Sequence, residues 1–328
     1  MKNRIILKYS FVIAILLVAD MNDCRAQISS MGANQSNRLF AVGDKYGKIG
    51  IWNANEESGI KYYDAHDTTI TSMLFVSTIK GDMLITAGKD GLIKMWDSNM
   101  SPIGSNKRVY MPVYALADHP QIPGEILFFN QSGSGYSFQL GSASPISRWT
   151  KSDDSNGVNF ALSSDSKGKQ LIAGFADGRV GRWAFSDSTT TIDFKEMRVS
   201  LDGAIMATDI SGDGKSFIFG TSAGKVEILT TKTFEPLYSL PLTSQVRSIL
   251  LSPDNELAVI GCKDGTIVFW GFNNNDVYLT KEHSNAVIGL NFANDYDDVI
   301  SSSVDGQIII WDRADAIVKK IIPWIPSE

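Results

Sequence analysis

The chain has few cysteines, few histidines and no apolar run long enough to cross a membrane. Its 328 residues include two cysteines, Cys24 and Cys262, and three histidines. An internal disulfide is excluded if Cys24 is removed by processing, because one cysteine is then left. The apolar run FVIAILLVA, residues 11–19, has nine residues, whereas a transmembrane helix needs roughly 20. The scarcity of histidine also argues against a metal centre or histidine-based catalysis.

The sequence lacks the compact motifs that mark many enzymes. It contains no Gly-x-Ser-x-Gly elbow, no phosphate-binding loop and no constellation of paired carboxylates. The stretch DISGDG, residues 209–214, resembles the start of a calcium loop, but its twelfth position is Gly220 where a bidentate Glu is required. A turn between two strands is the better interpretation. The sequence therefore predicts no cofactor, no metal site and no catalytic residue.

What the chain does have is a repeat. A turn containing Gly, followed by alternating apolar residues and a Trp, is clearest in KDGLIKMW, ADGRVGRW, KDGTIVFW and VDGQIIIW. Weaker copies are KYGKIGIW, SGSGYSF and SAGKVEIL. Each copy has a Gly five residues before its last residue, at positions 47, 91, 133, 178, 224, 265 and 306. Successive glycines are 41 to 46 residues apart, and such a regular period indicates a repeat architecture.

Each period contains the same four predicted strands. In the last repeat these are residues 287–293, 299–303, 307–311 and 316–322, which alternate between apolar and polar side chains or are apolar throughout. We expect Asp305-Gly306 to form a two-residue hairpin turn of the primed type, which needs the positive φ that Gly tolerates. Four strands in each period correspond to one propeller blade.

These repeats resemble the WD40-repeat β-propeller family over residues 27–322. The resemblance implies two complete structural tetrads, in the second blade (His66, Thr86, Asp90, Trp96) and in the seventh (His283, Ser301, Asp305, Trp311). In each, the Asp and the hydroxyl would satisfy the two ring nitrogens of the His, and the indole N–H would reach the hydroxyl. Such a network is structural and not catalytic. Other blades depart from it, because Asp177 and Asp264 have no matching His and blades 1, 3 and 5 lack the turn Asp.

The predicted fold class is all-β, a seven-bladed β-propeller of four-stranded antiparallel blades. Residues 27–328 are expected to form one such propeller, because no blade is stable without its neighbours and no linker breaks the period. Residues Trp52, Trp96, Phe138, Trp183, Leu229, Trp270 and Trp311 should stand at equivalent places on the third strand. Cys262 is expected to be a small core residue.

Residues 1–26 have the pattern of a secretory signal peptide. Lys2, Arg4 and Lys8 precede the apolar run, and small residues end the segment at Ala26. A buried N-terminal strand is the alternative, and lipidation at Cys24 is disfavoured by the preceding Asp23. We therefore expect export to the periplasm, the cell envelope or the medium, with no stable transmembrane anchor. Since the first inner strand begins at residue 28, the C-terminal strand must complete blade 7.

The mature chain is acidic, which favours protein partners over nucleic acid. Removal of residues 1–26 leaves 26 basic and 34 acidic residues, a formal charge of −8, which argues against general nucleic-acid binding. Because WD40 proteins act as interaction platforms, the resemblance implies a non-enzymatic, monomeric scaffold for a protein partner. The alternatives are a secreted propeller hydrolase or lyase, and a binder of glycans or small ligands with Trp149 and Trp324 as stacking residues, although both are expected to be packing residues.

The candidate partner-binding surface follows from the position just before the turn Asp, which in this family points toward partners. Blades 1, 2 and 6 carry Lys45, Lys89 and Lys263 there, with Tyr46 beside the first. Loops entering blades 4 and 5 supply the acidic residues Asp153, Asp154 and Asp202. The hypothesis is a face divided into a basic arc and an opposing acidic arc, whereas the alternative is a set of ordinary solvated turn residues.

Overall fold

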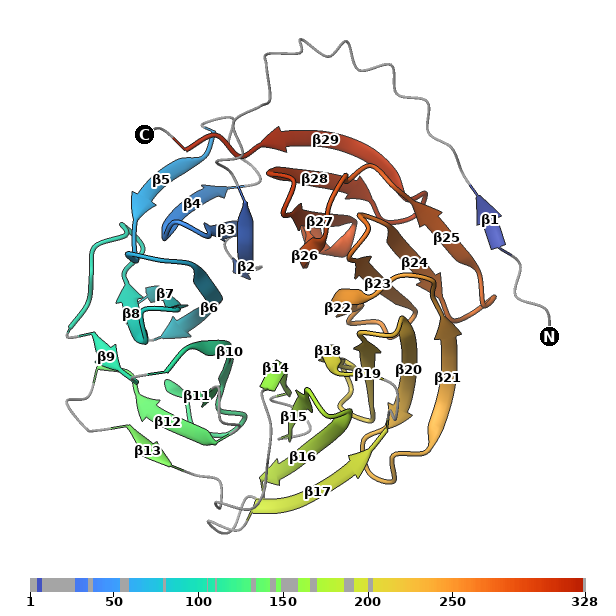
Figure 1. Cartoon of the computed structure of the whole chain (residues 1–328), viewed down its shortest axis with the longest axis horizontal. Coiled ribbons are helices and arrows are strands. Elements are labelled where there is room, and N and C mark those ends of the chain that lie inside the picture. The colour runs from blue at the N-terminus through green and yellow to red at the C-terminus, as the bar shows by residue number, and fades with distance from the viewer. Residues whose placement is uncertain are drawn as a thin grey trace.

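Seven four-stranded antiparallel sheets form a ring, as a computed structural model of the chain shows (Figure 1). We refer to the sheets as blades 1 to 7 and to their strands, from the axis outward, as inner, second, third and outer. The structure describes residues 5–7, 27–34, 38–53, 59–78, 81–104, 106–109, 111–130, 134–141, 146–148, 159–165, 170–185, 192–199 and 203–326. The predicted seven-bladed, all-β architecture is confirmed.

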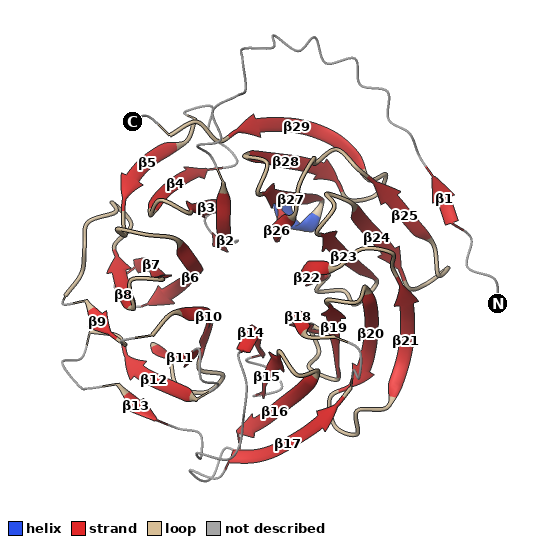
Figure 2. Ribbon diagram, in the orientation of Figure 1, coloured by secondary structure: helices blue, strands red, loops and turns tan. Residues whose placement is uncertain are grey.

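The strands follow the chain in order around the ring (Figure 2). The inner strands are β2 (Ile28–Asn34), β6 (Ile70–Thr78), β10 (Val113–Asp118), β14 (Asn159–Asp165), β18 (Ile205–Ile210), β22 (Val246–Leu251) and β26 (Val287–Ala293). The second strands are β3 (Leu39–Asp44), β7 (Gly81–Gly88), β11 (Glu125–Asn130), β15 (Gln170–Phe175), β19 (Ser216–Thr221), β23 (Leu257–Cys262) and β27 (Asp298–Ser303).

The remaining strands complete each blade toward the outside. The third strands are β4 (Lys48–Asn53), β8 (Leu92–Trp96), β12 (Gly135–Gln139), β16 (Arg179–Phe185), β20 (Lys225–Thr230), β24 (Ile267–Gly271) and β28 (Gln307–Asp312). The outer strands are β5 (Lys61–Asp64), β9 (Lys107–Arg108), β13 (Ser147–Arg148), β17 (Ile192–Arg198), β21 (Pro236–Pro241), β25 (Val277–Thr280) and β29 (Ile317–Pro323). Among the described residues the one helical segment is the 3-10 turn η1 (Asn294–Tyr296), and none is a helix with the length and apolar character to span a bilayer.

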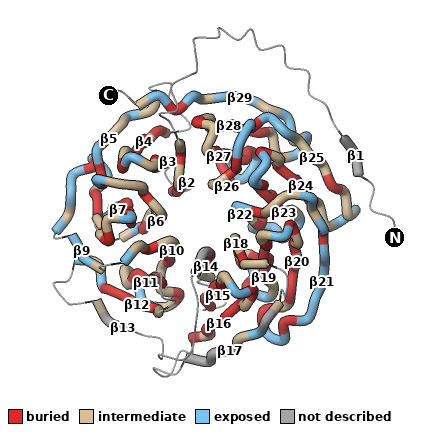
Figure 3. Tube along the Cα trace, in the orientation of Figure 1, coloured by how far each residue is buried: buried red, intermediate tan, exposed pale blue. Residues whose placement is uncertain are grey.

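The hydrophobic core lies within and between the blades, and the outer strands are the most exposed (Figure 3). Every residue of β15 and β27 is buried, because second strands are covered by a blade on each side. The seven residues predicted at equivalent third-strand positions all pair with the same place on their second strand, for example Trp52 with Phe40 and Leu229 with Phe217. In blade 5 the missing aromatic is compensated by Phe234, which is 2% exposed and packs near Leu229. Each such side chain contributes about 1.5–3 kcal/mol through burial.

The turns between second and third strands differ from the prediction. In blade 7 the N–H of Gly306 donates to the carbonyl of Ser303, so Val304 and Asp305 are the central residues of the turn. Neither has a positive φ, whereas Gly306 has φ of 79°. This is a three-residue loop, a type I turn followed by a left-handed Gly, and the predicted two-residue primed turn is wrong. The predicted need for positive φ at the Gly is confirmed.

Each inner strand contains a β-bulge at its second residue. The pairing register with the second strand shifts across Ser29, Thr71, Tyr114, Phe160, Met206, Arg247 and Ile288. A bulge leaves one residue unpaired and re-aims its side chain. Six of these side chains line a central cavity, and that of Phe160 lies outside the described residues.

The C-terminal residues close the ring. Blade 7 consists of β26 to β29 alone, as the sequence predicted, and β2 of blade 1 packs against β26. After β29, Trp324 turns across the seam, is 2% exposed, and packs its ring edge-on against Tyr62 of blade 1 at 4.9 Å. The backbone N–H of Ile325 donates to Tyr62 Oη at 3.1 Å. Trp324 is therefore a packing residue, as expected, and cannot stack on a sugar.

The segment β1 (Ile5–Leu7) lies outside the seven blades. It pairs in parallel with the outer strand β25 and adds a fifth strand to the edge of blade 6 (Figure 1). Residues 1–4 and 8–26 lie outside the described part of the chain. The four antiparallel strands of every blade come from residues 28–323, so β1 is an addition to a ring that is complete without it.

Candidate functional site

The loops at the two ends of the ring form two different faces. Because neighbouring strands are antiparallel, the loops entering the inner strands and the turns between second and third strands share one end, which we call the turn face. The other loops share the second end, which we call the opposite face. The candidate site includes the turn face and the channel that opens from it.

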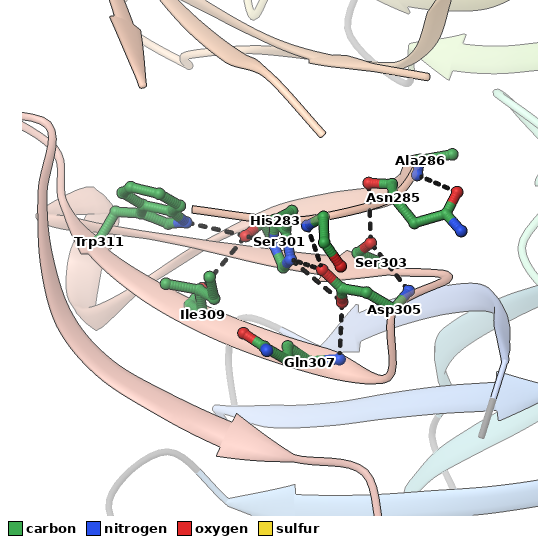
Figure 4. A network of polar contacts seen from close by, with 10 residues as sticks. His283, Asn285, Ala286, Ser301, Ser303, Asp305, Gln307, Ile309 and Trp311 are labelled. Carbon is green, nitrogen blue, oxygen red and sulfur yellow. Dashed lines mark hydrogen bonds and ion pairs between the residues drawn. The ribbon is translucent and has the colours of Figure 1, made fainter. Parts of the chain in front are cut away.

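Two buried tetrads brace the turn face. In blade 7, His283 Nδ1 donates to Asp305 Oδ2 at 3.1 Å, and His283 Nε2 is 2.8 Å from Ser301 Oγ (Figure 4). Trp311 Nε1 donates to the same hydroxyl at 2.8 Å. The hydroxyl accepts from the indole and donates to the imidazole, so the buried polar atoms satisfy one another. The predicted tetrad of blade 7 is confirmed.

The tetrad of blade 2 has the same geometry. His66 Nδ1 is 2.8 Å from Asp90 Oδ2, His66 Nε2 is 2.8 Å from Thr86 Oγ1, and Trp96 Nε1 donates to Thr86 at 3.0 Å. Asp90 Oδ1 also accepts from the N–H of Leu92, which fixes the turn. All of the predicted partners are therefore present.

Burial sets the charge of these groups. It lowers the pKa of His66 below 6.5, and this effect outweighs the hydrogen bond and charge of Asp90, which act in the opposite direction. Burial by itself would raise the pKa of Asp305, but the hydrogen bond and charge of His283 and the N–H groups of Ser284 and Gln307 together hold it below 3.8. The arrangement favours a neutral imidazole in blade 2 and a carboxylate in blade 7, which is consistent with a structural role.

Blades without a tetrad cap their turns in other ways. In blade 1 the buried Asp44 accepts from the N–H groups of Tyr46 and Lys48 at 2.8 and 2.9 Å. In blade 5 the hydroxyl of Thr221 accepts from the N–H of Lys225 at 2.9 Å. Both acceptors lie three residues before the turn Gly. The missing turn Asp is thus replaced by an oxygen at the end of the second strand.

The predicted lysines occupy equivalent places on the turn face. The backbone N–H groups of Lys45, Lys89 and Lys263 donate to the carbonyls of Gln27, Thr69 and Gln245, each the residue directly before the inner strand of its blade. Lys89 and Lys263 are exposed, and Lys45 is half-buried.

Tyr46 lies beside Lys45, as predicted. Tyr46 is 51% exposed, and Lys45 Nζ is 4.9 Å from the centroid of its ring. The predicted acidic residues Asp153, Asp154 and Asp202 lie outside the described residues, so the acidic arc stays a prediction.

The channel contains a cation that the sequence reasoning missed. A cavity of about 400 Å³ is lined by the bulged residues of six blades and by Lys89. Arg247, the bulged residue of blade 6, lies between Met206 of blade 5 and Ile288 of blade 7 in this ring. Solvent reaches its side chain through the channel, while desolvation by the surrounding walls lowers its pKa.

No acidic side chain balances this charge within the described lining of the cavity. Arg247 stands 23 residues before Trp270, the same offset as Ser29 before Trp52 and Ile288 before Trp311. That constant offset was the signal in the sequence that could have found it.

The remaining candidates for chemistry have structural roles. Burial raises the pKa of the Cys262 thiol to about 12, with a further contribution from Asp264, and the side chain is 1% exposed in the core, as predicted. His119 Nδ1 accepts from the N–H groups of Gln121 and Ile122 at 3.1 and 3.0 Å, so it caps a turn. Within the described part of the chain, no group of three or more His, Cys, Asp or Glu side chains could hold a metal ion.

The stretch DISGDG forms the turn between β18 and β19 that the sequence predicted. Asp209 faces away from it and accepts from the N–H groups of Leu251 and Ile210 at 2.7 and 2.9 Å. Asp213 accepts from the hydroxyl of Ser211 and the N–H of Lys215, which stabilises the turn. The two carboxylates therefore have different partners and do not form a calcium loop.

Comparison with known proteins agrees with this geometry. The family model described as WD domain, G-beta repeat, matches residues 58–97, 234–271 and 275–312. The first and third of these segments contain the two complete tetrads. These three segments of the chain match WD40 repeats. Each matched WD40 segment starts at the outer strand of one blade and ends at the third strand of the next, so the repeat and the blade are offset by one strand.

The chain is similar to parts of larger proteins. It is 21% identical over 216 residues to Regulatory-associated protein of TOR 1 from Arabidopsis thaliana, covering 61% of this chain and 16% of that protein. It is 22% identical over 211 residues to Retinoblastoma-binding protein 5 homolog from Drosophila melanogaster, covering 64% of this chain and 42% of that protein. It is 21% identical over 308 residues to human NACHT domain- and WD repeat-containing protein 1, covering 90% of this chain and 19% of that protein. The chain thus spans less than half the length of each of these relatives.

Proposed function

We propose that the protein is a non-enzymatic interaction platform that holds an acidic segment of a protein partner on its turn face. The observation that carries this proposal is the placement of positive charge. Lys45, Lys89 and Lys263 occupy equivalent turn positions, and Arg247 projects into the channel that opens among them. No described residue lining the channel is acidic, although the chain as a whole has a formal charge of −6.

The electrostatics favour recognition and orientation more than raw affinity. Each exposed lysine alone is worth ~0.2–1 kcal/mol in an ion pair. A concave site lined by one sign of charge concentrates the field and speeds the docking of an oppositely charged partner. Arg247 adds a planar fork of donors that can hold a carboxylate with two hydrogen bonds. Since its neighbours in the ring are Met206 and Ile288, no acidic side chain beside it competes with an inserted Asp or Glu for the guanidinium.

The names of the relatives support a platform. One is called a regulatory-associated protein and another a binding protein, and both names describe association with another protein. Those partners belong to the relatives. For this chain the partner is defined only by its chemistry, an acidic segment that fits the channel mouth.

The test is charge reversal on the turn face with a matched control elsewhere. Lys89→Glu and Lys263→Glu together should weaken binding of an acidic partner recovered by pull-down, and should flatten the dependence of affinity on salt. The control is Lys61→Glu and Lys320→Glu, which reverses two exposed charges on the outer strands β5 and β29. Arg247→Gln should weaken binding with little effect on folding. Unchanged affinity and salt dependence in both turn-face variants would rule out this surface.

We also propose that the protein is exported and that residues 1–26 are a cleaved signal peptide, which leaves a monomer without a stable membrane anchor. The sequence pattern supports this, and so does a ring whose blades begin at Ile28. A fusion of residues 1–30 to a reporter should be translocated and cut near Gln27, whereas Lys2, Arg4 and Lys8 all changed to Glu should block transport. N-terminal sequencing that finds Met1 on the native protein would refute export with cleavage.

A further inference from the structure

A basic pocket lies on the opposite face, between blades 4 and 5. It has a volume of about 650 Å³, within the range of small-ligand sites. Four cations contribute to its lining, from two strands and two loops: Arg182, Lys195, Lys215 and Lys232. No described residue that lines it is acidic. The chain has 36 acidic and 30 basic residues, so this local cluster of cations is opposite in sign to the net charge of the chain.

Hydrogen bonds of the neighbouring Gln170 orient Arg182 in the pocket. Arg182 Nε donates to Gln170 Oε1 at 2.6 Å, and Gln170 Nε2 donates to the carbonyl of Gly214 at 2.8 Å. Gln170 is 5% exposed, so its amide has lost its contacts with bulk water and depends on these two partners. The pair Gln170–Gly214 therefore positions the guanidinium, as a supporting shell positions a binding residue.

The carbonyl of Gly214, which lies beside Arg182 in the pocket lining, already accepts two hydrogen bonds from the protein. Gly214 O accepts from both Gln170 and the hydroxyl of Thr231, the latter at 2.8 Å. Lys195 Nζ lies 4.7 Å from the centroid of the Phe234 ring and donates to the carbonyl of Lys232 at 3.1 Å. An ammonium group has three N–H donors. Lys195 can therefore keep these contacts and still donate to a ligand.

Exposed lysines form the rim. Lys215 is 84% exposed, and its Nζ lies 3.4 Å from Asp213 Oδ2, a loose surface pair worth little. Lys232 is also exposed. Like charges gathered in one concave site raise the local concentration of counter-ions. The pocket thus combines an arginine oriented by Gln170 with exposed lysines at its rim.

We propose that this pocket binds a tetrahedral oxyanion, the phosphate or sulfate group of a small ligand. The arginine fork suits two oxygens of such a group, and the lysines supply point charges around the others. The residues come from β15, β16, β17 and the β18–β19 and β20–β21 loops, so the site needs both blades. It lies on the face opposite to the proposed partner surface, so the two functions can fail independently.

The experiment is titration calorimetry of the purified protein with inorganic phosphate and, separately, inorganic sulfate at constant ionic strength. Saturable binding of either anion is expected. Arg182→Met should weaken it at least tenfold, and Arg182→Lys should have a smaller effect because it keeps the charge and loses the fork. Lys195→Met with Lys232→Met gives an independent variant away from Gln170. Lys263→Met, on the turn face, should bind as the wild type does.

The two sources of the oxyanion are separated by pH. A phosphate monoester gains its second charge near pH 6 and inorganic phosphate about one pH unit higher, whereas sulfate keeps both charges. Inorganic phosphate binding that strengthens between about pH 6 and 8 while sulfate binds weakly identifies a phosphate site. Equal binding at every pH identifies a general oxyanion site. The proposal is overturned if neither anion binds saturably, or if folded Arg182→Met and Lys195→Met/Lys232→Met variants both bind as tightly as the wild type.

Discussion

The indole of Trp324 lies against Gly50, and this contact joins the end of the chain to blade 1. A Cβ at Gly50 would be 2.2 Å from Trp324 Cζ3 and 2.6 Å from Ile60 Cγ2, so the indole occupies the space that a side chain would need. The backbone N–H of Trp324 donates to the carbonyl of Gly306 at 2.8 Å, which ties the same residue to blade 7. One residue thus bridges the two blades where the ring closes.

The first prediction is an energetic coupling between Gly50 and Trp324. Trp324→Ala removes a buried aromatic and should cost about 3–5 kcal/mol of unfolding free energy. Gly50→Ala should cost about 1–3 kcal/mol through overpacking, and less in the Trp324→Ala background because the clash with the indole is gone. Urea denaturation of the four proteins measures the coupling. Ile325→Ala, at a side chain that is 68% exposed, is the control and should change stability little. Strict additivity would contradict the contact.

The second prediction concerns the edge of blade 7. Deleting residues 314–328 removes β29 and Trp324, which exposes the apolar edge of β28 and opens the seam. We expect a sharp fall in melting temperature and aggregation, because an unpaired strand edge recruits other chains. Differential scanning calorimetry and light scattering measure both effects. Deletion of residues 326–328, beyond Trp324, should leave melting unchanged. A truncated ring that melts like the intact one would show that closure does not depend on this strand.

The third prediction tests the tetrad of blade 7. Ser301→Ala leaves His283 Nε2 and Trp311 Nε1 without their shared partner in a buried site. A buried polar atom left unsatisfied costs about 1–3 kcal/mol, so a loss of this size per atom is expected in urea denaturation. Thr266→Ala removes a hydroxyl that donates to the exposed Asp264 and is the matched control. Equal stability of the two variants would mean that the tetrad contributes nothing to the fold.

The fourth prediction is a pH dependence from Asp209. Burial raises its pKa from 3.8 to about 6, although the N–H groups of Leu251 and Ile210 act to lower it. A raised folded-state pKa stabilises the protein fully below about pH 4, and this contribution is lost as the pH rises through about 6. The wild type should therefore lose about 3 kcal/mol relative to Asp209→Asn between pH 4 and 7, at 1.36 kcal/mol per pKa unit. Urea denaturation at several pH values measures this difference. A pH-independent difference would show that the buried carboxyl has an ordinary pKa.

The sequence predicted the framework of the fold well and one local detail wrongly. The seven third-strand residues, from Trp52 to Trp311, and both tetrads follow from spacings that recur along the chain. The turn at Asp305-Gly306 was predicted as a two-residue loop, because Asp-Gly fits both turn types and positive φ falls on Gly in each. The register of β27 against β28 distinguishes them, and register depends on packing of whole strands.

The candidate site also contains residues that the sequence predicted and one that it missed. Lys45, Lys89 and Lys263 were found because they precede the turn at a fixed position in three repeats. Arg247 was missed because its importance depends on a bulge that turns its side chain into the channel. Asp153, Asp154 and Asp202 stay predictions outside the described residues.

By itself the sequence determined the number of blades, their order and the residues that repeat in each, because a repeat unit makes the same local contacts wherever it occurs. Only the tertiary structure decided which residues meet across blades. Gln170, Arg182 and Gly214 line one pocket, and Gly50 meets Trp324, although the repeated sequence motif marks none of these positions. The physical reason is that these contacts exist only when neighbouring blades pack and the ring closes, which brings together residues far apart in the chain.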